Sequence, residues 1–157
     1  IQFPIGVLYE DLQTTPYLIH KCNKIVYCQG ATYYWYQRKG SIMHSYNYKN
    51  NVWYEAADQF VKFVMLNYSD LYEYAICRYV NDSFWSVVQR IALTDNCYNN
   101  IIYAREQCCF YWKKGLKNKY LKARKKINVL LMLISPRCYI LIYRFYWRFL
   151  KKQKELH

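Results

Sequence analysis

WYEAADQFVKFVML, residues 53–66, is the stretch of this chain with the clearest helical pattern. Its apolar residues recur at the i, i+3, i+4 and i+7 spacing that gathers side chains on one face of an α-helix. Two further helices are expected over about 70–80 and 84–94, because Ser69 and Ser83 stand where helix N-caps are common. The three helices predict a small bundle, whose core is completed by Leu71, Tyr74, Ala75, Phe84, Val87, Val88 and Ile91.

The first fifty residues show no helical periodicity. Short runs rich in β-branched and aromatic residues, KIVYC (24–28), TYYWYQ (32–37) and SIMHSYNY (41–48), are separated by turn-like segments. Pro4 and Pro16 are typical of an extended lead into such a region. The sequence therefore predicts a mainly α, α+β chain, with a short N-terminal β-hairpin or meander followed by the helical bundle.

A single long helix is expected from 99 to about 133, after a break at Asp95-Asn96. It contains KKGLKNKYLKARKK, residues 113–126, with eight positive charges and no negative ones. Gly115 falls on the charged side of this helix and indicates a kink or a close backbone approach. The helix is expected to touch its own protein along a narrow ridge, formed by Leu116, Tyr120, Ala123 and Ile127.

The segment after Pro136 has the pattern of an amphipathic helix. Its basic residues gather on one side of a helical wheel, and its aromatic and aliphatic residues gather on the other. We expect the basic side to face phosphates and the apolar side to dock on a neighbouring protein. The basic side contains Arg137, Arg144, Arg148, Lys151 and Lys152, and the apolar side contains Tyr139, Ile142, Tyr146, Phe149 and Leu150.

Charge is distributed unevenly along the chain. Residues 1–98 hold eight Lys/Arg and eight Asp/Glu, whereas residues 99–157 hold fifteen Lys/Arg against two Glu and account for the net charge of +13. This predicts a compact neutral body, β-rich over 1–50 and helical over 51–98, followed by a basic helical arm over 99–157. Such asymmetry favours a polyanionic partner such as RNA. The candidate RNA-binding residues are Lys113, Lys114, Lys117, Lys119, Lys122, Arg124, Lys125, Lys126, Arg137, Arg144, Arg148, Lys151 and Lys152.

A membrane surface is the alternative partner for the end of the chain. Residues 127–150 are long enough to span a bilayer. However, Arg137 and Arg144 would each cost roughly 2.5–3.5 kcal/mol near its centre. Pro136 also divides the apolar run. The membrane alternative is therefore a non-catalytic accessory subunit of a mitochondrial inner-membrane complex, of the respiratory chain or ATP synthase, with residues 127–152 on or in the membrane.

The sequence offers no catalytic residues and no cofactor motif. It has no Gly-rich phosphate loop, no HExxH and no GxSxG, so we expect a protein that is not an enzyme. No metal site is expected either. His20, Cys22 and Cys28 are the best metal-ligating candidates, but no CxxC pair supports them, and buried reduced thiols are the simpler interpretation.

Composition indicates an A/T-rich gene, because the chain has 20 Tyr but only 4 Gly and 3 Pro. Together with a first residue that is Ile1, this favours a mitochondrial gene, although an A/T-rich nuclear or viral gene gives the same composition. In composition, neutral body, basic arm and lack of catalytic motifs, the chain resembles the divergent ribosomal proteins encoded in protist mitochondrial DNA, of the ciliate type.

A local resemblance accompanies the general one. Arg90-Ile91, Cys97-Tyr98 and Lys122-Ala123-Arg124 resemble parts of a small-subunit ribosomal protein family with a Cys-Tyr-Arg-Gly turn and a basic Asn-Ala-Arg tail. Asn99-Asn100 stands in place of the Arg-Gly pair. The general resemblance implies a structural constituent of a mitochondrial ribosome in the matrix, whose arm contacts rRNA and whose body contacts neighbouring proteins. The ribosomal subunit stays open.

Overall fold

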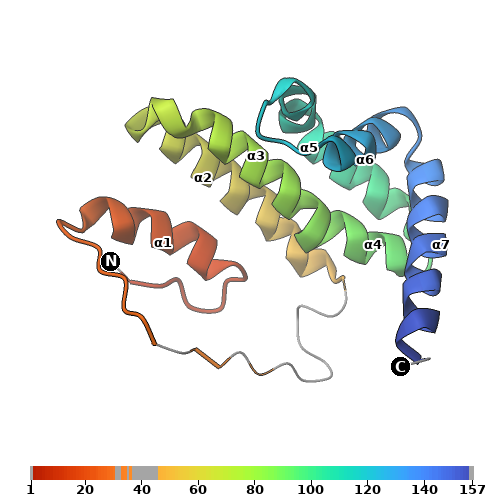
Figure 1. Ribbon diagram of the computed structural model, residues 1–157, viewed down its shortest axis with the longest axis horizontal. Helices are drawn as coiled ribbons and strands as arrows, with labels where there is room; N and C mark the ends of the chain where they lie inside the picture. Colours follow the sequence, from red (N-terminus) through yellow and green to blue (C-terminus); the bar gives the residue numbers. More distant parts are fainter. Residues whose placement is uncertain (1, 31–32, 35, 37–45, 156–157) are drawn as a thin grey trace.

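The computed structural model describes residues 2–30, 33, 34, 36 and 46–155, with side chains up to Phe149. All regular structure in these residues is helical (Figure 1). Short 3₁₀ turns at Tyr48–Asn51 and Ser69–Leu71 precede the second and third helices. The helices are α1 (Glu10–Lys21), α2 (Val52–Asn67), α3 (Tyr72–Ser83), α4 (Gln89–Leu93), α5 (Tyr98–Lys117), α6 (Ala123–Ile134) and α7 (Pro136–Glu155).

The predicted N-terminal β-hairpin is wrong for the residues that the structure describes, because none of them forms a strand. The run 24–28 is described and lies in irregular backbone, whereas most of 32–37 and 41–48 lies outside the described residues. Pro16 does not mark an extended lead but lies inside α1. The charged residues of α1 interact favourably with the helix dipole, because its first turn has two acidic residues and its last turn has two basic ones.

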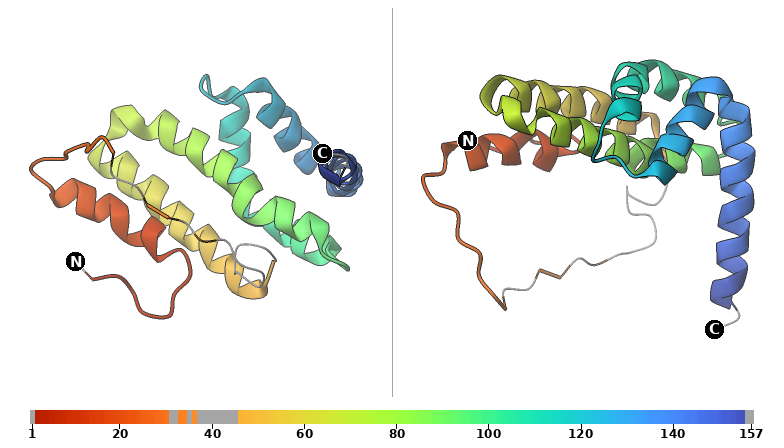
Figure 2. Two further views of the ribbon diagram at one scale, coloured as in Figure 1. Left: turned by 60° about the horizontal axis from the view of Figure 1, so that its bottom comes forward. Right: turned by 45° about the horizontal axis from the view of Figure 1, so that its top comes forward.

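Neighbouring helices pack in chain order. Helix α1 lies on α2, α2 on α3, α3 on α5, α5 on α6 and α6 on α7, which also contacts α4 (Figures 1 and 2). The rings of Tyr17 and Phe63, with centroids 4.5 Å apart, join α1 to α2. Helix α7 leaves the bundle at one end, and its last turns extend beyond the other helices (Figure 2). The N-terminal helix lies at the far side of the molecule from α7.

Helices α3 and α4 form one continuous rod, because a π-helical turn, Phe84–Val88, joins them. In this turn the Gln89 N–H bonds to the Phe84 carbonyl, one residue further back than in an α-helix. The predicted break at Ser83 is therefore wrong. The Ser83 side chain is instead buried, where its hydroxyl donates to the Val80 carbonyl (2.8 Å) and accepts from the Trp112 indole N–H (2.8 Å).

The rod carries the centre of the core. Apart from Ser86, its buried residues recur in pairs every four positions: Ala75–Ile76, Tyr79–Val80, Ser83–Phe84, Val87–Val88 and Ile91–Ala92. A straight α-helix has 3.6 residues per turn, so a four-residue repeat would drift around it. The wider π turn offsets part of this drift. Leu71 and Tyr74, predicted in the core, are about half exposed at 45% and 51%.

Helix α5 completes the core from the other side of α3. Ile101, Ala104, Cys108 and Trp112 are fully buried along it. Gly115 continues this buried line, and a Cβ placed there would lie 2.7 Å from Val80 Cγ2 on α3. The close approach that Gly115 indicated is therefore present, but it lies on the core side of the helix and not on the charged side.

Candidate nucleic-acid interface

Residues 113–126, called the basic turn below, do not form one helix. The predicted helix over 99–133 is wrong, because α5 ends at Lys117 and α6 begins at Ala123. The predicted inner ridge is also wrong: Tyr120 and Ile127 are exposed, whereas Leu121 is buried. The chain therefore reverses within the basic turn and presents cations from two helix ends and the segment between them.

Asn118 stops α5 and fixes the reversal. Its side chain is buried, and its amide nitrogen donates to the Glu73 carbonyl (2.7 Å) and to the Glu73 carboxylate (2.8 Å). Its amide oxygen accepts from the Tyr120 N–H (2.8 Å). Asn side chains compete with helical backbone bonds in this way. An Asn inside the lysine run is therefore the sequence signal that the helix ends there. A helical wheel does not reveal this signal, because it assumes that the helix continues through Asn118.

Most cations of the basic turn face solvent. Within the described residues the ion pairs are Lys62–Asp58 and Arg78–Asp82, so no cation of the basic turn is paired with a carboxylate. Surface cations usually have acidic neighbours that relieve repulsion. The exposed cations are Lys113, Lys114, Lys117, Lys119, Lys122 and Arg124, with Lys125 and Lys126 partly exposed.

The start of α6 concentrates this positive charge. Lys122 is the N-cap, Arg124, Lys125 and Lys126 lie in the first turn, and that turn has no acidic residue. A helix N-terminus is itself the positive end of the helix dipole, where cations are unfavourable and anions are favourable. The arrangement raises the local electrostatic potential at a cost in stability, and it suits a phosphate.

Two lysines of the basic turn are engaged by the body instead. The Lys114 ammonium donates to the Tyr72 hydroxyl (2.9 Å) and lies 4.8 Å from the Phe110 ring centroid. The Lys125 ammonium lies 5.5 Å from the Phe84 ring centroid. Burial lowers the pKa of Lys125, and the nearby Arg124 guanidinium lowers it further. Because of these contacts, both lysines are less available to a phosphate than the other cations of the basic turn.

Arg144 points into the protein and not toward solvent. Its guanidinium donates to the Ala92 carbonyl (2.7 Å) and to the Thr94 carbonyl (2.6 Å), and it lies 3.5 Å from Cys97 Sγ. It therefore satisfies the carbonyl groups at the C-terminus of α4, where the helix dipole is negative. The structure thus gives Arg144 a position inside the fold and not on the solvent-facing side of α7.

The other predicted cations of α7 lie in different settings. The Arg137 guanidinium stacks 4.6 Å from the Tyr98 ring centroid. Arg148 is exposed. Lys151 and Lys152 lie within α7, but their side chains are outside the described part of the chain.

Helix α7 exposes Ile142 and Phe149, which the sequence predicts on its docked side, together with Leu141 and Phe145, which it does not. These four residues are called the apolar ridge below. The exposed fractions of their side chains are 67% for Leu141, 54% for Ile142, 76% for Phe145 and 55% for Phe149. Tyr139 and Ile140 are buried on the opposite side, against the bundle. Among the described residues no helix combines the length and the apolar character that crossing a membrane needs.

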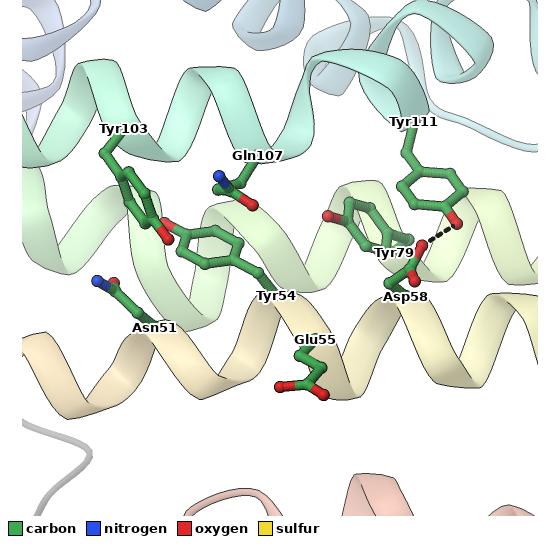
Figure 3. A pocket seen from close by; sticks show the side chains of 8 residues that line it. All are labelled: Asn51, Tyr54, Glu55, Asp58, Tyr79, Tyr103, Gln107 and Tyr111. Atoms are coloured by element: carbon green, nitrogen blue, oxygen red, sulfur yellow. Dashed lines mark hydrogen bonds between the residues drawn. The ribbon is translucent and has the colours of Figure 1, made fainter.

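A groove between α2 and α5, floored by α3, is a feature that sequence reasoning missed (Figure 3). It has a volume of about 320 Å³. The Tyr111 hydroxyl donates to Asp58 Oδ1 across it (2.6 Å). Because tertiary packing brings α2 and α5 together, with Asp58 and Tyr111 53 positions apart in the sequence, no spacing in the sequence predicts the groove. Its lining residues are Asn51, Tyr54, Glu55, Asp58, Tyr79, Tyr103, Gln107 and Tyr111.

The described residues contain no group of three or more His, Cys, Asp or Glu side chains that is arranged to hold a metal ion. Cys22 and Cys28 are exposed free thiols. His20 Nδ1 is hydrogen-bonded to the Tyr68 hydroxyl (2.9 Å). Cys108 is the most deeply buried thiol, and burial raises its pKa to about 12.

No protein-family model matches this chain, and neither a curated protein nor a solved structure matches it.

Proposed function

We propose that this chain is a structural rRNA-binding protein of a mitochondrial ribosome, located in the matrix, which contacts RNA phosphates through the basic turn. The observation that supports this most is the start of α6, where Lys122, Arg124 and Lys126 surround a helix N-terminus that has no acidic residue. Cationic side chains and a helix N-terminus both favour phosphate oxygens. No cofactor and no catalytic role are proposed.

The mitochondrial and ribosomal parts of the proposal rest on composition and on the resemblance described above. The apolar ridge of α7 supports the further idea that the chain works inside a larger assembly. Four large apolar side chains that are each more than half exposed along one helix are unusual for a protein that functions alone. A neighbouring protein of the same particle would cover them.

The test is the affinity for a structured RNA hairpin, measured by fluorescence anisotropy over a range of salt concentrations. If the protein neutralises about six phosphates, the log–log slope of affinity against salt is near −5. Replacing Lys113, Lys119 and Arg124 together by Gln should reduce the magnitude of this slope by about three units. All three are exposed and none forms an ion pair within the described chain.

The matched control is a triple Gln variant of Lys21, Lys24 and Lys49, which are exposed lysines of the neutral body. This control should leave the slope within about one unit of that of the unmodified protein. Equal losses in the two triple variants would contradict the proposal, because they would show that only the total charge matters.

A second candidate is the accessory subunit of a mitochondrial inner-membrane complex. The apolar ridge favours it, because exposed Leu, Ile and Phe beside Arg148 are typical of helices that lie in a membrane interface. Fractionation of isolated mitochondria separates the two candidates. A ribosomal protein is released by high salt or nuclease, whereas a membrane-bound subunit stays in the carbonate pellet until detergent is added.

A further inference from the structure

Two tyrosine rings lie stacked on the surface at the basic turn. Tyr120, in the segment between α5 and α6, packs on Tyr74 of α3, with ring centroids 4.0 Å apart and an angle of 22° between the ring planes. Tyr74 is 51% exposed and Tyr120 is 39% exposed. Within the described part of the chain, every other stacked ring pair contains a buried or partly buried ring. These two residues, called the tyrosine pair below, therefore present stacked rings to solvent.

The hydroxyls of the tyrosine pair lie at the same end of the stack. A hydrogen bond from the Tyr74 hydroxyl lowers the pKa of Tyr120, and a hydrogen bond from Lys119 lowers it further. The rings consequently lie face to face and not edge to face. In such a stack each ring covers one face of its partner and keeps a second face that the partner does not cover. Unpaired nucleic-acid bases stack on flat aromatic faces of this kind.

The fold holds both rings in position. The Asn118 side chain, which ends α5, accepts from the Tyr120 N–H (2.8 Å), and the next residue, Leu121, is buried in the core. Asn118 also donates to the carboxylate of Glu73 (2.8 Å), so the acidic group next to Tyr74 in the chain is already engaged. Tyr74 itself lies in the regular helix α3. Rings that are positioned before a ligand arrives lose less entropy on binding.

Positive charge accompanies the tyrosine pair. The Lys119 ammonium lies 5.0 Å from the Tyr120 ring centroid, and the exposed Lys117 and Lys122 are close to Tyr120 in the sequence. A cation–ring contact at an exposed site is weak. A nucleotide can replace it at little cost, because its base takes the ring and its phosphate takes the ammonium. The surroundings of the pair therefore favour a partner that carries both flat rings and negative charge.

We propose that the tyrosine pair is a stacking platform for an unpaired base of the RNA whose phosphates contact the basic turn. This inference rests on the proposed function and adds a preference to it. Phosphate contacts alone do not distinguish paired from unpaired bases. The tyrosine pair favours RNA with a bulge, a loop or a single-stranded end, because the bases of an intact duplex are already stacked on one another.

The test measures the affinity of the full chain for two RNAs by fluorescence anisotropy. One is a blunt RNA duplex, and the other is the same duplex with a short bulge of unpaired uridines. The unmodified protein should bind the bulged RNA about tenfold more tightly. Tyr120→Leu should weaken binding of the bulged RNA by roughly that factor and leave the affinity for the blunt duplex unchanged. Its salt slope should stay within about one unit of the original, because no phosphate contact is lost.

Three further variants show whether the rings carry this effect. Tyr120→Phe keeps the ring, so it should retain the preference for the bulged RNA to within about twofold. Tyr48→Leu is the matched control, since Tyr48 is 72% exposed but lies outside the basic turn, and it should change neither affinity. Tyr74→Leu combined with Tyr120→Leu should lose about as much affinity as the weaker of the two single variants, because both rings serve the same base. Thermal melts check that each variant is folded.

A crosslink locates the base. With 5-iodouridine in the bulge, irradiation of the complex should join the RNA to Tyr120 or Tyr74, as mapped by mass spectrometry. Suppose that both RNAs bind with the expected salt slope. The inference is then overturned, with the proposed function intact, if Tyr120→Leu affects both RNAs equally or not at all, if Tyr120→Phe loses as much as Tyr120→Leu, or if the crosslink falls on neither tyrosine. If neither RNA shows salt-dependent binding, the proposed function fails and this inference fails with it.

Discussion

The basic turn and helix α7 have similar residues and opposite arrangements. In the basic turn the apolar Leu121 and the small Gly115 are buried, and most of the cations face water. In α7 the cation Arg144 is turned inward, and Leu141 and Phe145 face water. A helical wheel identifies which residues share a side, but it does not say which side the rest of the protein covers. Tertiary contacts decide that, and in α7 the carbonyl groups at the end of α4 attract the arginine.

The largest expected effect tests the inward position of Arg144. Arg144→Met keeps an apolar stem but removes the donors to the Ala92 and Thr94 carbonyls. We expect a loss of about 2–4 kcal/mol in the free energy of unfolding, measured by urea denaturation, since hydrogen bonds from charged groups contribute about 1.5–3 kcal/mol each. The matched control is Arg148→Met, one turn further on and exposed, which should change stability by less than about 0.5 kcal/mol. Similar losses in both would mean that Arg144 has no special role.

The second effect tests which side of α5 Gly115 occupies. On an exposed side, Gly115→Ala would stabilise the helix by roughly 0.5–1 kcal/mol. In the structure the new methyl group would lie 2.7 Å from Val80 Cγ2, in a fully buried contact with a stiff side chain. We therefore expect a loss of roughly 1–3 kcal/mol. Val80→Ala should relieve part of this loss in the double variant, which is a measurable non-additivity. A stabilised Gly115→Ala single variant would contradict the packing described here.

The third effect tests whether the cations at the start of α6 lower the stability of the protein but strengthen RNA binding. Lys122 has the extended backbone of an N-cap, a position where Asp is among the best residues. Lys122→Asp should raise the melting temperature, corresponding to about 1 kcal/mol, and should also weaken RNA binding. Lys122→Ser separates the two contributions, because it caps the helix without adding negative charge. If Lys122→Asp leaves RNA affinity unchanged, the start of α6 does not contact RNA.

The smallest effect concerns Lys125, the half-buried cation of the basic turn. Its pKa is lowered by burial, so the unfolded chain holds this proton more tightly than the folded one. Stability should therefore rise slightly as the pH increases through the range below 10.5, the ordinary lysine value. Lys125→Met should remove this rise while keeping the contact with the Phe84 ring. Lys122→Met, at an exposed site, should leave the rise in place. Thermal melts between pH 8 and 10.5 measure both.

Periodicity predicted the elements whose contacts are local. Helix α2, the break near Asp95-Asn96 and the helix after Pro136 are confirmed. Helix α1 was missed for two reasons. Pro16 is unusual inside a helix, and the contact that holds α1 in place comes from Phe63 on α2, which is far away in the sequence. The predicted long helix failed at Asn118, whose partner Glu73 is 45 residues away in the sequence. A contact between residues so far apart in the sequence produces no periodic pattern from which it could be predicted.

The candidate site follows the same rule. The cluster of lysines was visible as composition, but the division into available and engaged cations depends on Tyr72 and Phe84, which belong to another helix. The α2–α5 groove was invisible, because its lining side chains come from three helices that only tertiary packing brings together.

The π turn at Phe84–Val88 has a consequence for how this chain can change in length over time. A π turn is what remains when an α-helix absorbs one inserted residue without unwinding. The residue pairs before and after it are both buried, so each half of the rod is already matched to its neighbours. Deleting one residue within 84–88 should therefore leave a continuous α-helix with Ile91 and Ala92 still turned toward the core, whereas inserting one more residue would rotate them by about 100° out of it. This segment can lose one residue more easily than it can gain one.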